Sequence, residues 1–232
     1  MFRFISSKKT VELKKEYLAK YKVKLLQRKL DALMVKYPEI KAVLPADISA
    51  RKLLVGNFRY LTKVYCAFTS YLNGKPQAEK ARILSAFVTN GFNYDSHSSK
   101  IAKFLTDASN GFDIHNCVYC DFEDVTTFTK ANGQEVRRFE TEHVLDKGLC
   151  PLVALSLYNF VPSCGTCNGP ALKGTKTIGD TEYEISKLSP SAEGYDFDGK
   201  VQFEVKVVTP GTTDLKATDH ADDYEVDFNV ME

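Results

Sequence analysis

Two Cys-x2-Cys pairs constrain the fold of this chain more than any other feature of its sequence. The first pair is Cys117 and Cys120, and the second is Cys164 and Cys167. Each pair can wrap a tight turn that points two thiolates at one ion, and two such turns complete a closed tetrahedral zinc site without a position for water. The sequence therefore predicts a structural zinc ion that holds the intervening residues as a closed loop.

Disulfide bonds and a thioredoxin-like redox pair are the alternatives to zinc. No stretch of the chain approaches the length of a membrane span or of a signal-peptide core, which favours a soluble, cytoplasmic protein with reduced thiols. A redox site needs only one Cys-x2-Cys pair. Cys66 and Cys150 lie outside the pairs, and their apolar neighbours predict buried, inert thiols.

The two parts of the chain carry opposite charge, although the net charge is only +1. Residues 1–110 contain 21 Lys and Arg against 8 Asp and Glu, whereas residues 111–232 contain 10 against 22. A polycation attracts nucleic acid because binding releases counterions from the phosphates. A solvated helical surface docked on the acidic part is the other interpretation of this asymmetry.

Apolar residues recur at the helical period through the first part of the chain. Pro45 interrupts the pattern, and Asp47 and Ser49 are residue types that cap helix N-termini. Asn-Gly steps at residues 90–91 and 110–111 are stop signals. We therefore expect an all-helical module, with helices over residues 10–37, from 47 or 49 to about 71, 77–90 and 98–107.

Strand patterns replace the helical ones after Cys117. Asn132-Gly133 is a strong turn signal, and the segments around it predict a hairpin over residues 123–143. Alternation of apolar and polar residues predicts two further strands, 201–207 and 224–230, which form an antiparallel hairpin with an exposed acidic loop over residues 214–223. The last strand reaches almost to residue 232, which suggests that the natural chain continues.

These patterns predict an α+β protein in three parts. The parts are a basic helical module over residues 1–110, a zinc-knuckle core over residues 111–180, and an acidic β-rich region over residues 181–232.

The segment around the second cysteine pair carries polar residues that a simple zinc ribbon does not need. They are Glu142-His143, Asn159, Asn168 directly after Cys167, and Lys173. This arrangement resembles the HNH nuclease family, whose pattern is an acidic residue and a His ending a strand, an Asn after a loop, Cys-x2-Cys-Asn and a downstream Lys. The resemblance covers residues 112–176, about a quarter of the chain. It implies a central ββα-metal core.

The resemblance further implies a metal-dependent endonuclease that hydrolyses phosphodiester bonds in DNA. His143 is the expected general base, because a neutral imidazole accepts a proton from water near pH 7. Asn159 is expected to orient that ring. Glu142 and Asn168 offer the oxygen ligands that Mg²⁺ or Mn²⁺ prefers, and Lys173 offers a positive charge to phosphate.

One residue departs from the family pattern. Glu142 stands where the family usually has Asp, so its carboxylate is displaced by about one bond length. Alternation along a strand also places Glu142 and His143 on opposite faces unless the strand ends or twists there. Glu140 and Asp146 are alternative carboxylates, and Lys147 is a second candidate for phosphate binding.

Each motif residue also has a purely structural interpretation. His143 can be an ordinary histidine at a strand end, Asn159 can end the short helix predicted by PLVALSLYN, and Asn168 can shape the zinc turn. The remaining histidines, which we expect at the surface without a role, are His97, His115 and His220.

Three alternatives to a DNA endonuclease follow from the same residues. The site can be degenerate, which leaves a zinc-knuckle module that binds nucleic acid or protein. The chain can instead act on RNA, or serve as a toxin-like effector. The resemblance permits an ATPase partner subunit, as in bacterial defence systems, and no membrane partner is expected.

Overall fold

The computed structural model describes residues 7–112, 114–170, 172–176, 179, 181–192, 195, 201–207 and 224–230. The chain divides into two compact units, Met1–Tyr195 and Asp196–Glu232. Helices and short antiparallel strand pairs make up the first unit, and one antiparallel strand pair makes up the described part of the second. The predicted α+β class is confirmed. The division into three parts stays a prediction.

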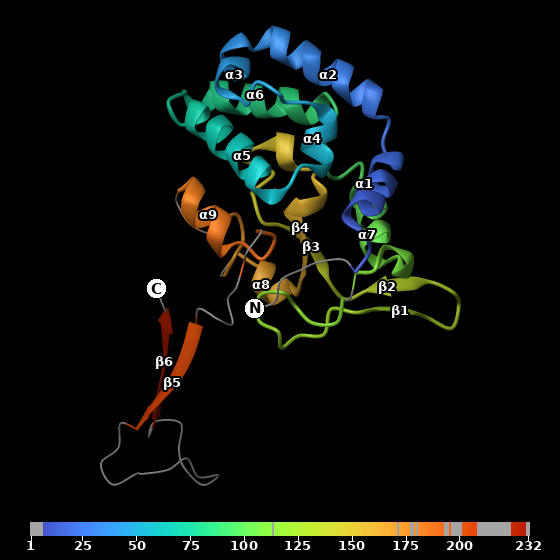
Figure 1. Cartoon of the computed structure of the whole chain (residues 1–232), viewed down its shortest axis with the longest axis vertical. Coiled ribbons are helices and arrows are strands. Elements are labelled where there is room, and N and C mark those ends of the chain that lie inside the picture. The colour runs from blue at the N-terminus through green and yellow to red at the C-terminus, as the bar shows by residue number, and fades with distance from the viewer. Residues whose placement is uncertain are drawn as a thin grey trace. The chain divides into compact units, whose positions relative to one another are not determined.

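Helices fill the N-terminal part of the first unit, as the apolar periodicity predicts (Figure 1). In chain order they are α1 (Thr10–Ala19), α2 (Val23–Lys36), α3 (Pro38–Val43), α4 (Ala50–Val55), α5 (Phe58–Asn73), α6 (Gln77–Thr89) and α7 (Ser98–Thr106), followed by the 3-10 turn η1 (Ala108–Asn110).

The single helix predicted over residues 10–37 is two helices, because the chain turns at residues 20–22. No Gly or Pro stands at this turn, so its cause is tertiary. The ring of Tyr21 stacks on His97 with 5.4 Å between centroids, and the hydroxyl of Tyr17 donates to the carbonyl of Leu155 at 2.9 Å. These long-range contacts outweigh the local preference to continue the helix.

The helix predicted to extend to about residue 71 is likewise divided, into α4 and α5. Ser49 caps α4 as predicted, since its side chain accepts from Lys52 N at 3.2 Å. Gly56 then leaves the helix in an extended conformation, and a Cβ there would collide with the carbonyl oxygen of Lys52. Asn57 caps the next helix by accepting from Tyr60 N at 3.0 Å.

The predicted hairpin around Asn132-Gly133 is present but shorter than expected. It consists of β1 (Thr127–Thr129) and β2 (Glu135–Arg137). The next strand, β3 (Glu140–His143), leaves this hairpin and pairs antiparallel with β4 (Phe160–Ser163). Phe139, between β2 and β3, is buried in a cluster with cysteines of both pairs, which separates the two strand pairs. The short helix α8 (Gly165–Asn168) follows β4.

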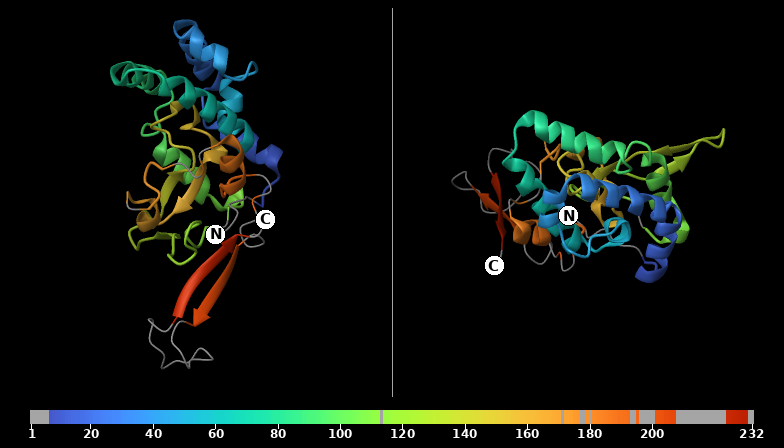
Figure 2. Two further views of the ribbon diagram at one scale, coloured as in Figure 1. Left: turned by 90° about the vertical axis from the view of Figure 1, so that its left-hand side faces the viewer. Right: turned by 90° about the horizontal axis from the view of Figure 1, so that it is seen from above.

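The loop from β3 to β4 is buried against the helices. It contains the 3-10 turns η2 (Pro151–Val153) and η3 (Leu157–Asn159), which contact α4 and α5. Residues 150–157 are all buried. Figure 1 shows this gold segment enclosed by α4, α5 and α6, and Figure 2 shows it beside the helices from two further directions. The helical part therefore supports the strand pair that carries the motif residues.

The remaining elements close the first unit and form the second. α9 (Glu182–Leu188) begins with a capping box between Thr181 and Glu184 and contacts α5. β5 (Val201–Val207) pairs antiparallel with β6 (Tyr224–Val230), which confirms both predicted strands. The acidic loop over residues 214–223 and His220 lie outside the described residues. No helix in the described ranges is long and apolar enough to cross a bilayer.

Candidate functional site

The two cysteine pairs meet at one place, as their spacing predicts. The Sγ atoms of Cys117, Cys120, Cys164 and Cys167 all lie within 4.8 Å of one another. Four thiolates around zinc at about 2.3 Å form a tetrahedron with edges of about 3.8 Å, so small side-chain adjustments would complete the coordination. Only Cys120 of the four is exposed. The thiol groups therefore fit a structural metal ion.

Backbone hydrogen bonds shape the first cysteine turn and tie it to the second. Asp121 N donates to Cys117 O at 2.8 Å, and Asp121 adopts a left-handed conformation with φ 54°. Asn116 stabilises that conformation by donating from Nδ2 to Asp121 O at 3.2 Å. Val118 N donates to Pro162 O at 3.2 Å, which joins the first turn to the end of β4.

The second cysteine turn places the residues that follow it. Cys167 N donates to the Sγ of Cys164 at 3.4 Å, and Asn168 N donates to Cys164 O at 3.0 Å. Lys173 N donates to Cys167 O at 3.0 Å. The second cysteine pair and Lys173, the candidate phosphate ligand, are therefore joined by backbone hydrogen bonds within one turn.

The two cysteines outside the cluster have no such arrangement. Cys150 is buried and Cys66 is half-buried, and neither forms a disulfide. Burial raises the pKa of both thiols, which keeps them protonated near neutral pH. This agrees with the inert thiols predicted from their apolar neighbours.

Glu142 and Lys173 form a buried ion pair beside the cysteine cluster. The distance from Glu142 Oε1 to Lys173 Nζ is 2.8 Å, and each side chain is only 8% exposed. Burial raises the pKa of Glu142, while the Lys173 ammonium opposes that shift. The structure thus brings a predicted metal ligand and the predicted phosphate ligand into direct contact.

Glu140 and Asn168 form a second pair near the first. Asn168 Nδ2 donates to Glu140 Oε2. Glu140 and Glu142 are two residues apart on β3 and so share one face of the strand. That face presents two carboxylates, an amide and an ammonium, and Glu140, named above as an alternative carboxylate, belongs to this group.

His143 has different surroundings, as alternation along β3 requires. Its ring packs edge-on against Tyr94 and Phe160, with centroid distances of 4.5 and 5.0 Å. The residue is 6% exposed. Burial lowers the pKa of His143 to about 3, and the positive charges of Lys147 and Lys173 add to this effect. The ring is therefore neutral near pH 7.

A single hydrogen bond fixes the tautomer of that neutral ring. His143 Nε2 lies 3.1 Å from the carbonyl oxygen of Ala154. Because a carbonyl oxygen can only accept, Nε2 carries the proton and Nδ1 keeps its lone pair. Nδ1 is thus the basic atom of the ring.

Asn159 holds the loop between the strands rather than the histidine ring itself. Its Oδ1 accepts from Leu145 N at 2.7 Å, and its Nδ2 donates to the carbonyls of Leu145 and Val153, both at 3.0 Å. The residue is fully buried. Since Val153 precedes Ala154, Asn159 acts on His143 through the loop backbone, in place of the direct orientation implied by the family resemblance.

Asn159→Ala is expected to destabilise the protein by roughly 3 kcal/mol, because it removes three hydrogen bonds and leaves buried backbone groups without partners. Chemical denaturation monitored by circular dichroism measures the loss. Asn132→Ala, at an exposed hairpin turn with one backbone hydrogen bond, is the matched control and should cost less than about 1 kcal/mol. Equal effects of the two substitutions would contradict the role of Asn159.

Tyr94 and Lys147, which are not residues of the family motif, also lie near His143. Tyr94, which contacts the ring, lies between α6 and α7, and nothing in its local sequence distinguishes it. The Nζ of Lys147 lies 5.5 Å from the centroid of the Tyr94 ring. Asp146, the other alternative carboxylate, accepts from Gly148 N at 2.6 Å and shapes the loop.

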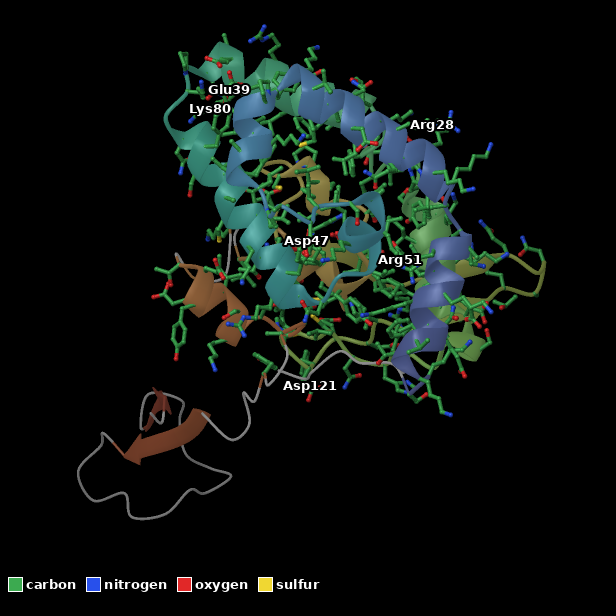
Figure 3. All side chains as sticks on the ribbon, turned by 45° about the horizontal axis from the view of Figure 1, so that its top comes forward. Arg28, Glu39, Asp47, Arg51, Lys80 and Asp121 are labelled. Carbon is green, nitrogen blue, oxygen red and sulfur yellow. The ribbon has the colours of Figure 1, made fainter. Side chains whose placement is uncertain are left out.

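The basic charge of the helical part is largely exposed. Arg28, for example, projects outward from α2 in Figure 3 and is exposed. His115 is exposed as predicted, whereas His97 is half-buried in its stack with Tyr21.

Comparison with known proteins gave no match. Neither protein-family models, nor curated proteins, nor solved structures gave a match to this sequence or fold.

Proposed function

We propose that this chain is a metal-dependent endonuclease of the HNH type that hydrolyses phosphodiester bonds in DNA. The observation that carries the proposal is the hydrogen bond from His143 Nε2 to Ala154 O, at the end of a strand whose previous residue is a buried carboxylate. This bond leaves the lone pair of Nδ1 to accept a proton, although burial lowers the pKa of the ring and so makes it a weaker base than a histidine in water.

The order of elements supports the same proposal. β3 carries Glu142 and His143, β4 returns antiparallel, and α8 with its following turn carries Asn168 and Lys173. In this strand–strand–helix arrangement the four-cysteine group, with zinc as the proposed ion, braces the helix end. Asn159 fixes the loop that presents the Ala154 carbonyl to the base.

A catalytic divalent ion is proposed beside Glu142, where it would take the place of the Lys173 ammonium on the carboxylate. Carboxylate and amide oxygens from Glu142, Asn168 and Glu140 are ligands of the kind that Mg²⁺ and Mn²⁺ prefer. Such an ion would supply a Lewis acid for the phosphate. The residues of the chain would accept the proton of water at His143 Nδ1 and place the Lys173 ammonium near the phosphate charge.

The exposed lysines and arginines of the helical part would supply affinity for the phosphate backbone. Such contacts bind nucleic acid without regard to sequence and weaken as salt rises. DNA is the proposed substrate, with RNA as the alternative, and an ATPase partner subunit remains part of the proposal through the family resemblance.

A non-catalytic zinc-knuckle module is the second candidate function. The Glu142–Lys173 pair favours it, because the carboxylate proposed to bind metal is already neutralised within the protein. The nearly complete burial of His143 between two aromatic rings, and the low pKa that this burial causes, favour it as well.

The two candidates differ in whether the purified protein cleaves nucleic acid. We expect nicking of supercoiled plasmid DNA when Mg²⁺ or Mn²⁺ is added, and none when both are omitted from zinc-containing protein. The same assay on structured RNA tests the alternative substrate. Absence of cleavage on both substrates would favour the binding module, and cleavage without an added ion would contradict the catalytic metal.

A further inference from the structure

A basic pocket of about 420 Å³ lies in the first unit, where the turn between α1 and α2 meets the end of α6 and the start of α7. Among the described residues that line it there is no Asp or Glu. The lining residues that matter for its chemistry are Lys20, Lys22, Lys29, His97, Lys100 and Leu155.

The positive charge of this pocket is largely uncompensated. Lys20 lies near enough to Asp107 to lower the pKa of that carboxyl, after the larger effect of Ser109. Within the described parts of the chain, Lys22 and Lys29 have neither an ion pair nor a side-chain hydrogen bond. Gathering like charges round a recess raises their mutual repulsion, and a bound anion would offset that cost.

Several contacts fix the pocket before any ligand arrives. Lys100 Nζ donates to Lys20 O at 3.0 Å and lies 5.1 Å from the centroid of the Tyr21 ring. Gly91 adopts φ +118°, and a Cβ there would lie 2.9 Å from Leu26 Cδ1 and 3.2 Å from Lys29 Cδ, so the glycine makes room for both side chains. Lys100 and Lys29 therefore contact other parts of the wall, whereas the side chain of Lys22 is exposed.

His97 is also held in place. Its Nδ1 lies 3.0 Å from Asn93 O, so Nδ1 carries a proton. Its Nε2 has no hydrogen-bond partner among the described residues. The rings of His97 and Tyr21 stack on one another, which favours a ligand recognised by its charge over one recognised by base stacking.

The wall of the pocket continues into the residues that hold His143. Leu155 follows Ala154, whose carbonyl accepts the hydrogen bond from His143 Nε2. On the other side, His97 N donates to Tyr94 O at 2.8 Å, and the Tyr94 ring packs on the ring of His143. A ligand in the pocket would thus contact the elements that present the proposed base.

We propose that this pocket binds a phosphate group of the nucleic-acid strand, and so anchors the strand next to the elements that carry His143. The inference rests on the proposed function, because the continuity with His143 selects a nucleic-acid phosphate over a free phosphate compound. Apart from Leu155, the lining residues lie outside the HNH-like segment and belong to the helical part of the unit.

Binding of fluorescein-labelled DNA, measured by polarisation without Mg²⁺ or Mn²⁺, tests the pocket independently of cleavage. Lys22→Gln/Lys29→Gln removes two pocket charges that have no structural partner, and Lys41→Gln/Lys63→Gln removes two exposed charges elsewhere in the helical part. We expect the pocket variant to weaken binding about tenfold and to reduce the slope of log Kd against log salt by about 1 to 2. The control should change Kd less than about twofold.

The other outcomes overturn the inference. Equal weakening by both variants would mean that only total charge matters, and no weakening by the pocket variant would mean that the strand binds elsewhere. A second experiment measures the shift in melting temperature that inorganic phosphate or pyrophosphate causes, which reports binding of a free phosphate compound. If the pocket variant loses that shift but keeps its DNA affinity, the pocket takes a free phosphate compound. A protein that binds through the pocket yet cleaves nothing would contradict the proposed function alone.

Discussion

If the cysteine cluster holds the proposed zinc ion, Cys164→Ala is expected to abolish zinc binding and to unfold the segment around the two cysteine pairs. The strands β1 and β2 have three residues each and the buried cluster around Phe139 is small, so apolar packing alone cannot hold this segment. Loss of a structural metal is among the largest single-site effects, and we expect a loss of about 5 kcal/mol or more. Metal analysis measures the loss of zinc, and chemical denaturation measures the loss of stability.

Cys150→Ala is the matched control, because Cys150 is also buried but lies outside the cluster. It should keep one zinc ion per chain and lose about 1–2 kcal/mol from the smaller side chain. Hydrogen exchange should show lost protection in β3, β4 and α8 for Cys164→Ala only. Full zinc content in that variant, or wild-type protein without metal whose thiols are oxidised, would contradict the metal cluster.

The cysteine cluster could be predicted because its signal is local. Each pair needs only a tight turn to bring two thiols together, and Cys-x2-Cys spacing suits that turn. The hairpin turn at Asn132-Gly133 and the cap at Ser49 are predictable for the same reason, since each depends on a few neighbouring residues. Alternation similarly placed Glu142 and His143 in different surroundings along β3.

The surroundings of the candidate base could not be predicted, because they come from distant parts of the chain. Tyr94 reaches His143 from the connection between α6 and α7, and no spacing in the sequence relates the two residues. The Glu142–Lys173 pair also depends on how the turn after α8 folds back on β3. The break between α1 and α2 also depends on a distant contact, because the ring of Tyr21 stacks on His97, the N-cap residue of α7.

These distant contacts give the helical part a second role beside its charge. α4, α5 and α6 enclose the loop that Asn159 fixes, and that loop offers the Ala154 carbonyl to the imidazole. The position of the His143 ring therefore depends on helices that carry no motif residue. The basic pocket lies where the helical part meets the loop between β3 and β4, because its wall includes both helical residues and Leu155.

His143→Gln is expected to lower the rate of metal-dependent DNA cleavage by about 10³-fold, the usual contribution of a general base. Glutamine can still donate from its amide to Ala154 O, so the hydrogen bond that positions the side chain is retained. It has no nitrogen that accepts a proton, so the loss isolates the basicity of Nδ1. Single-turnover cleavage of a labelled duplex measures the rate, and denaturation and zinc content check the fold.

His115→Gln is the matched control, because it makes the same chemical change at an exposed histidine outside the motif. Its cleavage rate should stay within about twofold of the wild-type rate, as surface substitutions away from a site usually do. If His143→Gln keeps more than about a tenth of the wild-type rate, His143 is not the base. Glu140 and Glu142, on the opposite face of β3, would then be the next candidates, because a carboxylate can also accept a proton from water.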